Sequence, residues 1–206
     1  MTAHTMSPRR QRNRDAMIQT ILDTARAIMR EEGVAALSMQ ELARRLDMRA
    51  PSIYNYFPGK MAIYDALFRL GFTHFGETMA AAVVGAATWS EDLQCTVEAY
   101  MAFALQNPDL YQLCFERPVP GFVPSAESLQ VSFGQLHAAY ARVGRWRTSI
   151  HTELSPEQTT DLVIAMMHGL TALHLSNEPH LPVGQGRFGA LIEPMLSVLE
   201  KAWSQP

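Results

Sequence analysis

The chain has 206 residues, of which 48% are hydrophobic and 18% charged, a composition typical of globular rather than disordered proteins. Its longest apolar stretch, residues 79–87, is far shorter than the ~20 residues that a membrane-spanning helix needs. The formal net charge of −3 is unevenly divided, because residues 1–60 carry +4 and residues 61–206 carry −7. The N-terminal part is therefore the part expected to meet a polyanion.

The compartment is predicted from the N-terminus and the cysteines. The basic N-terminus is not followed by the apolar stretch that an export signal requires. Cys95 and Cys114 are expected to be buried thiols rather than a disulfide, and neither has histidines at metal-ligand spacing. We expect a cytoplasmic, nucleoid-associated protein without a metal or a cofactor.

The first predicted elements follow a basic stretch over residues 1–13, which we expect to be a flexible arm. Apolar residues over 14–32 recur at the spacing of an amphipathic helix, which Gly33 ends. Ser38 and Glu41 have the spacing of a capping box and place the start of a second helix at residue 38. The inner face of this helix is apolar, and Gln40, Arg44 and Arg45 are predicted to point outward.

A third, very short helix is predicted to begin at Pro51 and to end at Pro58-Gly59. Ile53 and Phe57 lie four residues apart and are predicted to be core. A helix barely two turns long is not stable alone, so the two helices around it must hold it. A helix, a three-residue turn and a short helix form the helix-turn-helix arrangement, whose second helix enters the major groove of DNA.

The polar side chains of this short helix are interpreted as DNA-binding groups. Tyr54, Asn55 and Tyr56 would bond phosphates and base edges, and the turn at Gly59 would bring Lys60 beside the DNA backbone. Two neighbouring tyrosines taken alone would more often be amphipathic core residues. The cap, the turn length, the proline and the basic charge together favour DNA binding.

Residues 14–75 resemble the N-terminal domain of the TetR family of transcriptional regulators, most clearly in Tyr54-x-Tyr56-Phe57-x-x-Lys60. The resemblance implies contacts with phosphates and bases at the start of the second helix, and a phosphate contact by Lys60. Two departures from the family pattern are Asp47 at the turn glycine, which should need a strained or altered turn, and Arg49 at the small capping residue, which should add a contact to phosphate or base. The implied DNA-binding residues are Ser38, Gln40, Arg49, Ala50, Pro51, Ser52, Tyr54, Asn55, Tyr56 and Lys60.

The remainder of the chain is also predicted to be helical, so the predicted fold is all-α. It consists of a helix-turn-helix DNA-binding domain over residues 14–60 and a helical effector-binding and dimerisation domain over residues 61–206. Residues 106–115 and 166–173 are similar to the C-terminal domain type named for a Trp-His-Gly motif, with Met167 in place of the tryptophan. The predicted helices span 61–86, 89–106, 108–116, 125–147, 156–175 and 188–203.

Two further groups of residues are predicted in the second domain. The resemblance implies a ligand between its helices, and methionine and aromatic side chains suit a hydrophobic effector; the candidates are Phe103, Tyr111, Phe115, Phe133, His137, Met167 and His168. The last two helices carry more apolar surface than one small domain needs. An ordinary core is one explanation, and a two-fold dimer seam in a four-helix bundle is the preferred one. The seam candidates are Leu162, Met166, Leu170, Leu173, Leu191, Ile192, Met195 and Leu199.

Enzyme signatures are absent, and the G-x-G-x-x-G match at residues 184–189 lacks the strand that a dinucleotide site requires. The sequence therefore predicts a homodimeric repressor that a small, largely hydrophobic effector releases from a palindromic operator in double-stranded DNA. A ligand-independent architectural DNA-binding protein is the alternative. A helical small-molecule-binding or catalytic protein with a vestigial N-terminal domain is a third hypothesis, against which Tyr54, Tyr56 and Lys60 argue.

Overall fold

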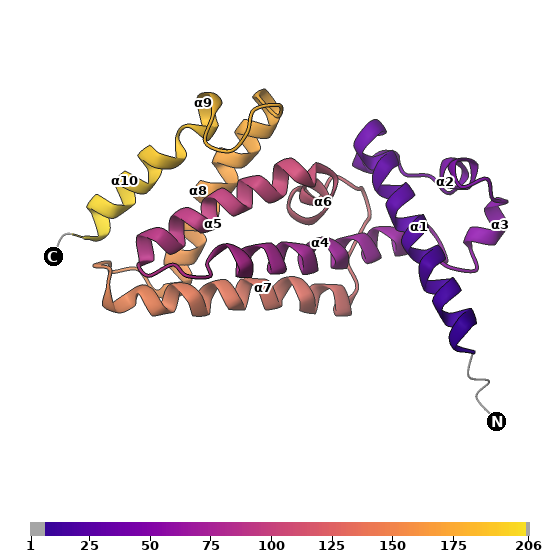
Figure 1. Ribbon diagram of the computed structural model, residues 1–206, viewed down its shortest axis with the longest axis horizontal. Helices are drawn as coiled ribbons and strands as arrows, with labels where there is room; N and C mark the ends of the chain where they lie inside the picture. Colours follow the sequence, from indigo (N-terminus) through magenta and orange to yellow (C-terminus); the bar gives the residue numbers. More distant parts are fainter. Residues whose placement is uncertain (1–6, 205–206) are drawn as a thin grey trace. The chain divides into compact units, whose positions relative to one another are not determined.

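The computed structural model describes residues 7–204, and the chain is all-α over this range, as predicted (Figure 1). It divides into two compact units. Unit 1 comprises the described residues up to Leu70 together with Asp109–Ser128, and unit 2 comprises Gly71–Pro108 together with the described residues from Leu129 onward. The division differs from the boundary expected at residue 60, because the segment Asp109–Ser128 packs with the N-terminal helices.

The first helix of unit 1 is longer than expected. Helix α1 begins at Pro8, so residues 8–13 of the expected flexible arm are helical, and residues 1–6 lie outside the described range. Ser7 takes the extended backbone of an N-cap residue, and Pro8 suits the first helical turn, where its missing N–H costs nothing. The helices that begin in this part of unit 1 are α1 (Pro8–Glu32), η1 (Val34–Ala36), α2 (Met39–Arg45), α3 (Ala50–Ile53) and α4 (Lys60–Ala82).

The segment Asp109–Ser128 contributes to the core of unit 1. The Tyr64 hydroxyl, on α4, donates a buried hydrogen bond of 2.6 Å to the carbonyl of Val34. The Tyr64 ring lies 5.8 Å from the Phe122 ring. The Asp109 carboxylate accepts hydrogen bonds from Arg26 and Arg30 of α1. This segment contains all of α6 (Pro108–Tyr111) except its first residue, the π-helical turn η2 (Gln112–Glu116), and the first three residues of α7 (Ala126–Gly144).

Unit 2 is built around α5 (Trp89–Gln106), which packs against α8 and α10. Capping boxes start α5 at Thr88 and α8 at Ser155, as their sequences require. The helix expected over 188–203 is split into α9 and α10. Gly189, the last residue of α9, lies so close to His174 that a Cβ there would be 3.2 Å from the imidazole Nδ1. The other helices are η3 (Arg145–Thr148), α8 (Pro156–Asn177), α9 (Gly186–Gly189) and α10 (Ile192–Trp203).

All three tryptophans of the chain meet in unit 2. The ring of Trp89, at the start of α5, lies 6.4 Å from that of Trp146 in η3 and 5.6 Å from that of Trp203 at the end of α10. The Trp203 carbonyl also accepts a hydrogen bond of 2.7 Å from the amide of His151. The cluster therefore joins three segments at one place.

Both cysteines are free thiols, as predicted, but Cys95 is half-buried rather than buried. Cys114 is buried, and this burial raises the pKa of its thiol well above the usual value. Among residues 7–204, no helix combines the length and the apolar character that a membrane crossing requires.

Candidate nucleic-acid interface

Helix α2 is started by the predicted cap, but only half of the capping box forms. The Ser38 hydroxyl oxygen accepts a hydrogen bond of 3.1 Å from the Glu41 amide. The Glu41 carboxylate instead accepts hydrogen bonds of 2.7–2.8 Å from Arg44 and Arg45. These bonds lower the pKa of Glu41 to about 2. Ser38 and Gln40 remain exposed at the start of α2.

Arg45 has a different role from the one predicted. Arg44 points outward, whereas Arg45 is largely buried and makes ion pairs with Glu31 at 2.6 Å, Glu32 at 2.5 Å and Glu41 at 2.7 Å. Two of these carboxylates lie at the end of α1, so Arg45 holds α2 against α1. Sequence spacing alone placed Arg45 on the solvent face, because the acidic residues come from another helix.

The turn between α2 and α3 has the strained backbone that Asp47 led us to expect. Asp47 adopts a φ of 51°, in the left-handed region that the family's glycine would occupy without strain. The Met48 amide donates a hydrogen bond of 3.0 Å to the Ala43 carbonyl, which closes the turn. Arg49 takes the N-cap position of α3, and its side chain is exposed.

The third helix is shorter than predicted. α3 covers only Ala50–Ile53, and residues 54–56 continue as turns. Ile53 and Phe57 are buried, as predicted, and fix this segment on its core side. The polar side chains lie on the outside, where Tyr54 is 52% exposed and Asn55 and Lys60 are also exposed. Pro51 is exposed as well, and Ala50, Ser52 and Tyr56 are half-buried.

Arg14 is part of this arrangement, although its neighbours in the sequence do not single it out. Its guanidinium donates a hydrogen bond of 3.0 Å to the Asn55 carbonyl and lies over the Tyr56 ring, 5.3 Å from the ring centre. Because this contact spans 41 residues, no local pattern could have indicated it. Arg14 therefore holds the end of the α3 segment against α1.

Comparison with known proteins decides the family. Residues 21–67 match the family described as "Bacterial regulatory proteins, tetR family", and residues 93–199 match "Tetracyclin repressor-like, C-terminal domain". The chain belongs to the TetR family. TetR-family proteins are DNA-binding transcriptional regulators and not enzymes.

Similar proteins agree with this assignment. An uncharacterised helix-turn-helix transcriptional regulator of Bacillus subtilis, YobS, is 35% identical over 92 residues, which are 45% of this chain and 48% of YobS. The chain thus spans about half the length of the curated relatives it matches.

Two solved structures share the fold. A protein of unknown function from Rhodococcus sp. RHA1 matches with a TM-score of 0.77 and 18% identity, over 91% of this chain and 95% of that one. The transcriptional regulator FadR from Bacillus subtilis, in complex with stearoyl-CoA, matches with a TM-score of 0.68 and 18% identity, over 88% and 96% of the two chains.

The seven candidate effector residues of this TetR-family chain are divided between the two units. Tyr111 and Phe115 lie in unit 1, while the other five lie in unit 2. Within unit 2, Phe133 is 53% exposed on α7 and His137 is also exposed on that helix.

Within unit 2, neighbouring rings connect Phe103 and His168. His168 Nδ1 lies 2.9 Å from the Tyr100 hydroxyl, and the Phe75 ring packs edge-on against both Tyr100 and Phe103, at 5.8 and 5.4 Å. Met167, beside His168, is buried. The Trp-His-Gly type of C-terminal domain stays a prediction.

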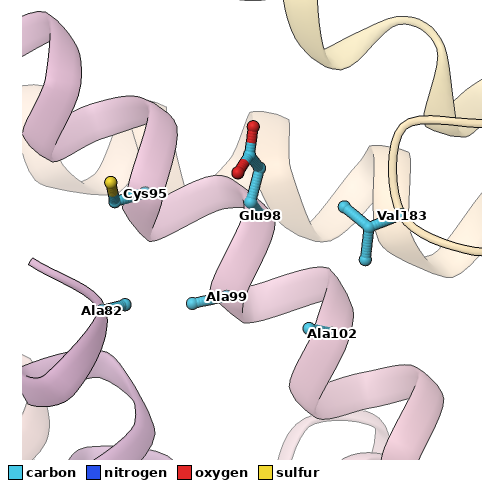
Figure 2. A pocket seen from close by; sticks show the side chains of 6 residues that line it. All are labelled: Ala82, Cys95, Glu98, Ala99, Ala102 and Val183. Atoms are coloured by element: carbon cyan, nitrogen blue, oxygen red, sulfur yellow. The ribbon is translucent and has the colours of Figure 1, made fainter.

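An open groove of about 360 Å³ lies elsewhere in unit 2 (Figure 2). Ala82 and Ala99 point toward one another across it, and Glu98 is the one charged residue among the described residues that line it (Figure 2). None of the seven candidates lines the groove, because mostly small side chains leave this space open and all seven candidates have large ones. Its lining residues are Ala82, Cys95, Glu98, Ala99, Ala102 and Val183.

The predicted seam residues divide by burial. Leu162, Leu173 and Leu191 are exposed, and Met166 and Leu170 are half-buried. Ile192, Met195 and Leu199 are buried within unit 2 itself, so they belong to its core.

The larger exposed apolar residues at α10 are Leu191, which precedes the helix, and Pro194 and Val198 within it. The apolar periodicity of α10 thus identified its core face, and each of these exposed residues lies one position before a buried one. On α8, Leu162, Met166, Gly169 and Leu173 recur at the four-three spacing of helices that pack side by side.

Proposed function

We propose that the chain is a repressor that binds a palindromic DNA operator as a homodimer in the cytoplasm and is released by a small, largely hydrophobic effector. The observation that carries the DNA-binding part is the exposed polar face around α3, held in place by the buried Ile53 and Phe57. The residues that we propose to contact DNA are Ser38, Gln40, Arg49, Ala50, Pro51, Ser52, Tyr54, Asn55, Tyr56 and Lys60.

Their chemistry suggests a division of tasks. Ser38 and Lys60 lie at the starts of α2 and α4, where the positive end of a helix favours a phosphate. The first turn of α4 carries no acidic residue that would oppose it. Ser52 and Asn55 can hydrogen-bond base edges, which supplies sequence specificity. Tyr56 is held by Arg14, so we assign it mainly to positioning the α3 segment.

Two apolar faces support the homodimer. The exposed residues of α8 and α10 lie on helices that both pack against α5, so they can belong to one interface of unit 2. A two-fold dimer would present its two α3 segments to half-sites about 34–36 Å apart, or a multiple of this distance, along the DNA.

The ring cluster of unit 2 supports a hydrophobic effector. Phe75, Tyr100 and Phe103 are apolar walls, and the Tyr100–His168 pair supplies a polar contact for a head group. The Bacillus subtilis FadR structure, which has the same fold, is a complex with stearoyl-CoA, and this supports an effector with a hydrophobic part. An effector acts only through its different affinities for two conformations, and a tenfold loss of operator affinity needs about 1.4 kcal/mol of coupling.

The DNA-binding proposal is tested by selecting fragments of the source genome with the purified protein and footprinting the best of them. A short palindromic footprint supports the repressor, whereas spread, sequence-tolerant protection supports the architectural alternative. Lys60→Ala should weaken binding to all sequences and reduce the slope of log K against log salt by about 0.9 for each phosphate that the variant no longer neutralises. An unchanged slope in a folded variant would show that Lys60 does not contact DNA.

The effector proposal is tested by screening hydrophobic and anionic compounds for release of the selected operator. The screen is repeated with His168→Ala and Met167→Ala, and with Ala99→Leu, whose larger side chain would fill the open groove. Loss of response in the first two variants places the effector in the ring cluster, and loss in Ala99→Leu alone places it in the groove. Release by phosphorylated metabolites only, equal in all variants, would refute the proposal.

A further inference from the structure

The first turns of α1 carry a group of exposed arginines whose side chains do not contribute polar contacts to the described part of the fold. Arg9, Arg10 and Arg12 are exposed, and within residues 7–204 none of them makes an ion pair or a side-chain hydrogen bond. Arg26 and Arg45 of unit 1, in contrast, are neutralised, since Arg26 pairs with Asp109 and Arg45 with three glutamates. The positive charge at the start of α1 is therefore available to an outside partner.

The position of these arginines works against the helix that carries them. The N-terminal end of a helix is its positive end, where acidic residues are favourable and basic ones are not. The first turn of α1 nevertheless contains no acidic residue. Arginines at this end of the helix reduce its stability, and residues that reduce stability locally are often found at functional sites.

The geometry of α1 relates this charge to the recognition segment. Arg10 and Arg14 lie four residues apart and share a face of the helix, about 6 Å from one another along its axis. Arg14 on that face contacts Asn55 and Tyr56, at the end of the α3 segment. In Figure 1 the first turns of α1 run on past α3. Arg10 therefore lies one helical turn beyond the proposed DNA-contacting residues, and Arg9 and Arg12 lie within the same turn.

We propose that the first turns of α1 form a second DNA-contacting element, in which Arg9, Arg10 and Arg12 bind backbone phosphates next to those approached by the α3 segment. The inference rests on the proposed DNA-binding function and extends it to residues outside the helix-turn-helix. Guanidinium groups on long, exposed side chains suit phosphate oxygens, because each can donate two hydrogen bonds to one phosphate. Such contacts add affinity and register, and they carry no sequence information themselves.

The test compares the wild-type protein with R9Q/R10Q/R12Q on two duplexes. One is the selected operator with natural sequence on both sides, and the other is the same operator trimmed to its footprint core. The charge-conserving R9K/R10K/R12K is the first control. R145Q/R147Q/R187Q is the second, because it removes three arginines from unit 2 and so makes the same change in net charge. Affinities are measured by fluorescence anisotropy from 50 to 200 mM salt, and helix content by far-UV circular dichroism.

The glutamine variant should fold normally, bind the extended operator more weakly and show a salt slope lower by about 0.9 for each phosphate that the arginines had neutralised. Its affinity deficit should shrink about threefold per phosphate as salt rises from 50 to 200 mM, and the lysine variant should recover most of the affinity. Its preference for the operator over unrelated DNA should stay within about twofold, because phosphate contacts carry no sequence information.

The other outcomes overturn the inference. A salt slope equal to that of the wild type, or an equal loss of affinity in the unit 2 control, would show that the three arginines do not contact DNA. A deficit that lysine does not restore would point to altered folding of α1 rather than to charge. If the wild-type protein itself selects no operator, the proposed function fails, and that result differs from all of these.

Discussion

Replacing Asp109 should destabilise the protein more than the loss of any surface ion pair would. Its carboxylate is 0% exposed and accepts hydrogen bonds of 2.7 Å from Arg26 Nε and 2.8 Å from Arg30 Nε. It lies on the segment Asp109–Ser128, which joins unit 1 after an interruption of 38 residues along the chain (71–108). Asp109→Ala would leave two guanidinium groups without their shared partner.

The magnitude follows from the exposure of the partners. Removing one member of a fully buried ion pair costs about 3–5 kcal/mol, because the other charge stays dry and unpaired. The side chains of Arg26 and Arg30 are 18% and 44% exposed, so both regain water when Asp109 is removed. We therefore expect Asp109→Ala to lower the free energy of unfolding by about 2–3 kcal/mol. Arg30→Ala should cost only about 1 kcal/mol, since the buried carboxylate keeps Arg26.

Urea unfolding followed by far-UV circular dichroism measures these differences. The matched control is Glu127→Ala, which breaks the exposed pair with Arg69 at 3.6 Å and should cost at most about 0.5 kcal/mol. If Asp109→Ala costs no more than Glu127→Ala, with an unchanged denaturant slope, the buried carboxylate does not stabilise unit 1 and the reasoning is refuted.

The pKa of Asp109 gives this stabilisation a pH dependence. Burial alone would raise the pKa, but the hydrogen bonds from the two arginines outweigh it and hold the pKa below its usual value. The wild-type protein should thus be more stable than Asp109→Asn by the full amount above pH ~5, and this difference in the free energy of unfolding should be lost as pH falls below ~4. Urea unfolding across this pH range measures it. Asp47→Gly should raise the free energy of unfolding by up to about 1 kcal/mol by relieving its positive φ, and thermal unfolding at a lower temperature than wild type would contradict this. Val198→Glu, at a side chain that is 61% exposed, should give a folded monomer in light scattering, whereas Leu199→Glu should unfold unit 2; a persisting Val198→Glu dimer would place the seam elsewhere.

The local elements around α3 were predictable because their signals lie close together in the sequence. Gly33 ends α1, Ser38 caps α2, and Pro51 opens α3, each for a reason that neighbouring residues supply. The unusual turn at Asp47 was expected instead from the family resemblance, since a residue with a Cβ replaces the family's turn glycine. The earlier start of α1 also had a signal, the Ser7-Pro8 pair, which the basic charge of this stretch obscured.

Contacts between distant residues were not predictable. Arg26 and Asp109 are 83 residues apart, and Arg14 and Asn55 are 41 apart, so no periodic pattern connects them. The seam residues show a second limit. Periodicity identified the apolar positions of α10 but not which of them face their own unit, and Leu199 proved to be core while Val198 is exposed.

The tryptophan cluster has an experimental consequence. Because all three indoles lie in unit 2, intrinsic fluorescence excited near 295 nm reports on that unit alone, whereas circular dichroism reports on the helices of both. The tryptophans are thus an intrinsic fluorescent probe of unit 2. Separate unfolding of the two units would appear as two transitions that these signals place at different urea concentrations, and DNA bound through unit 1 would leave the indoles free to report on an effector bound to unit 2.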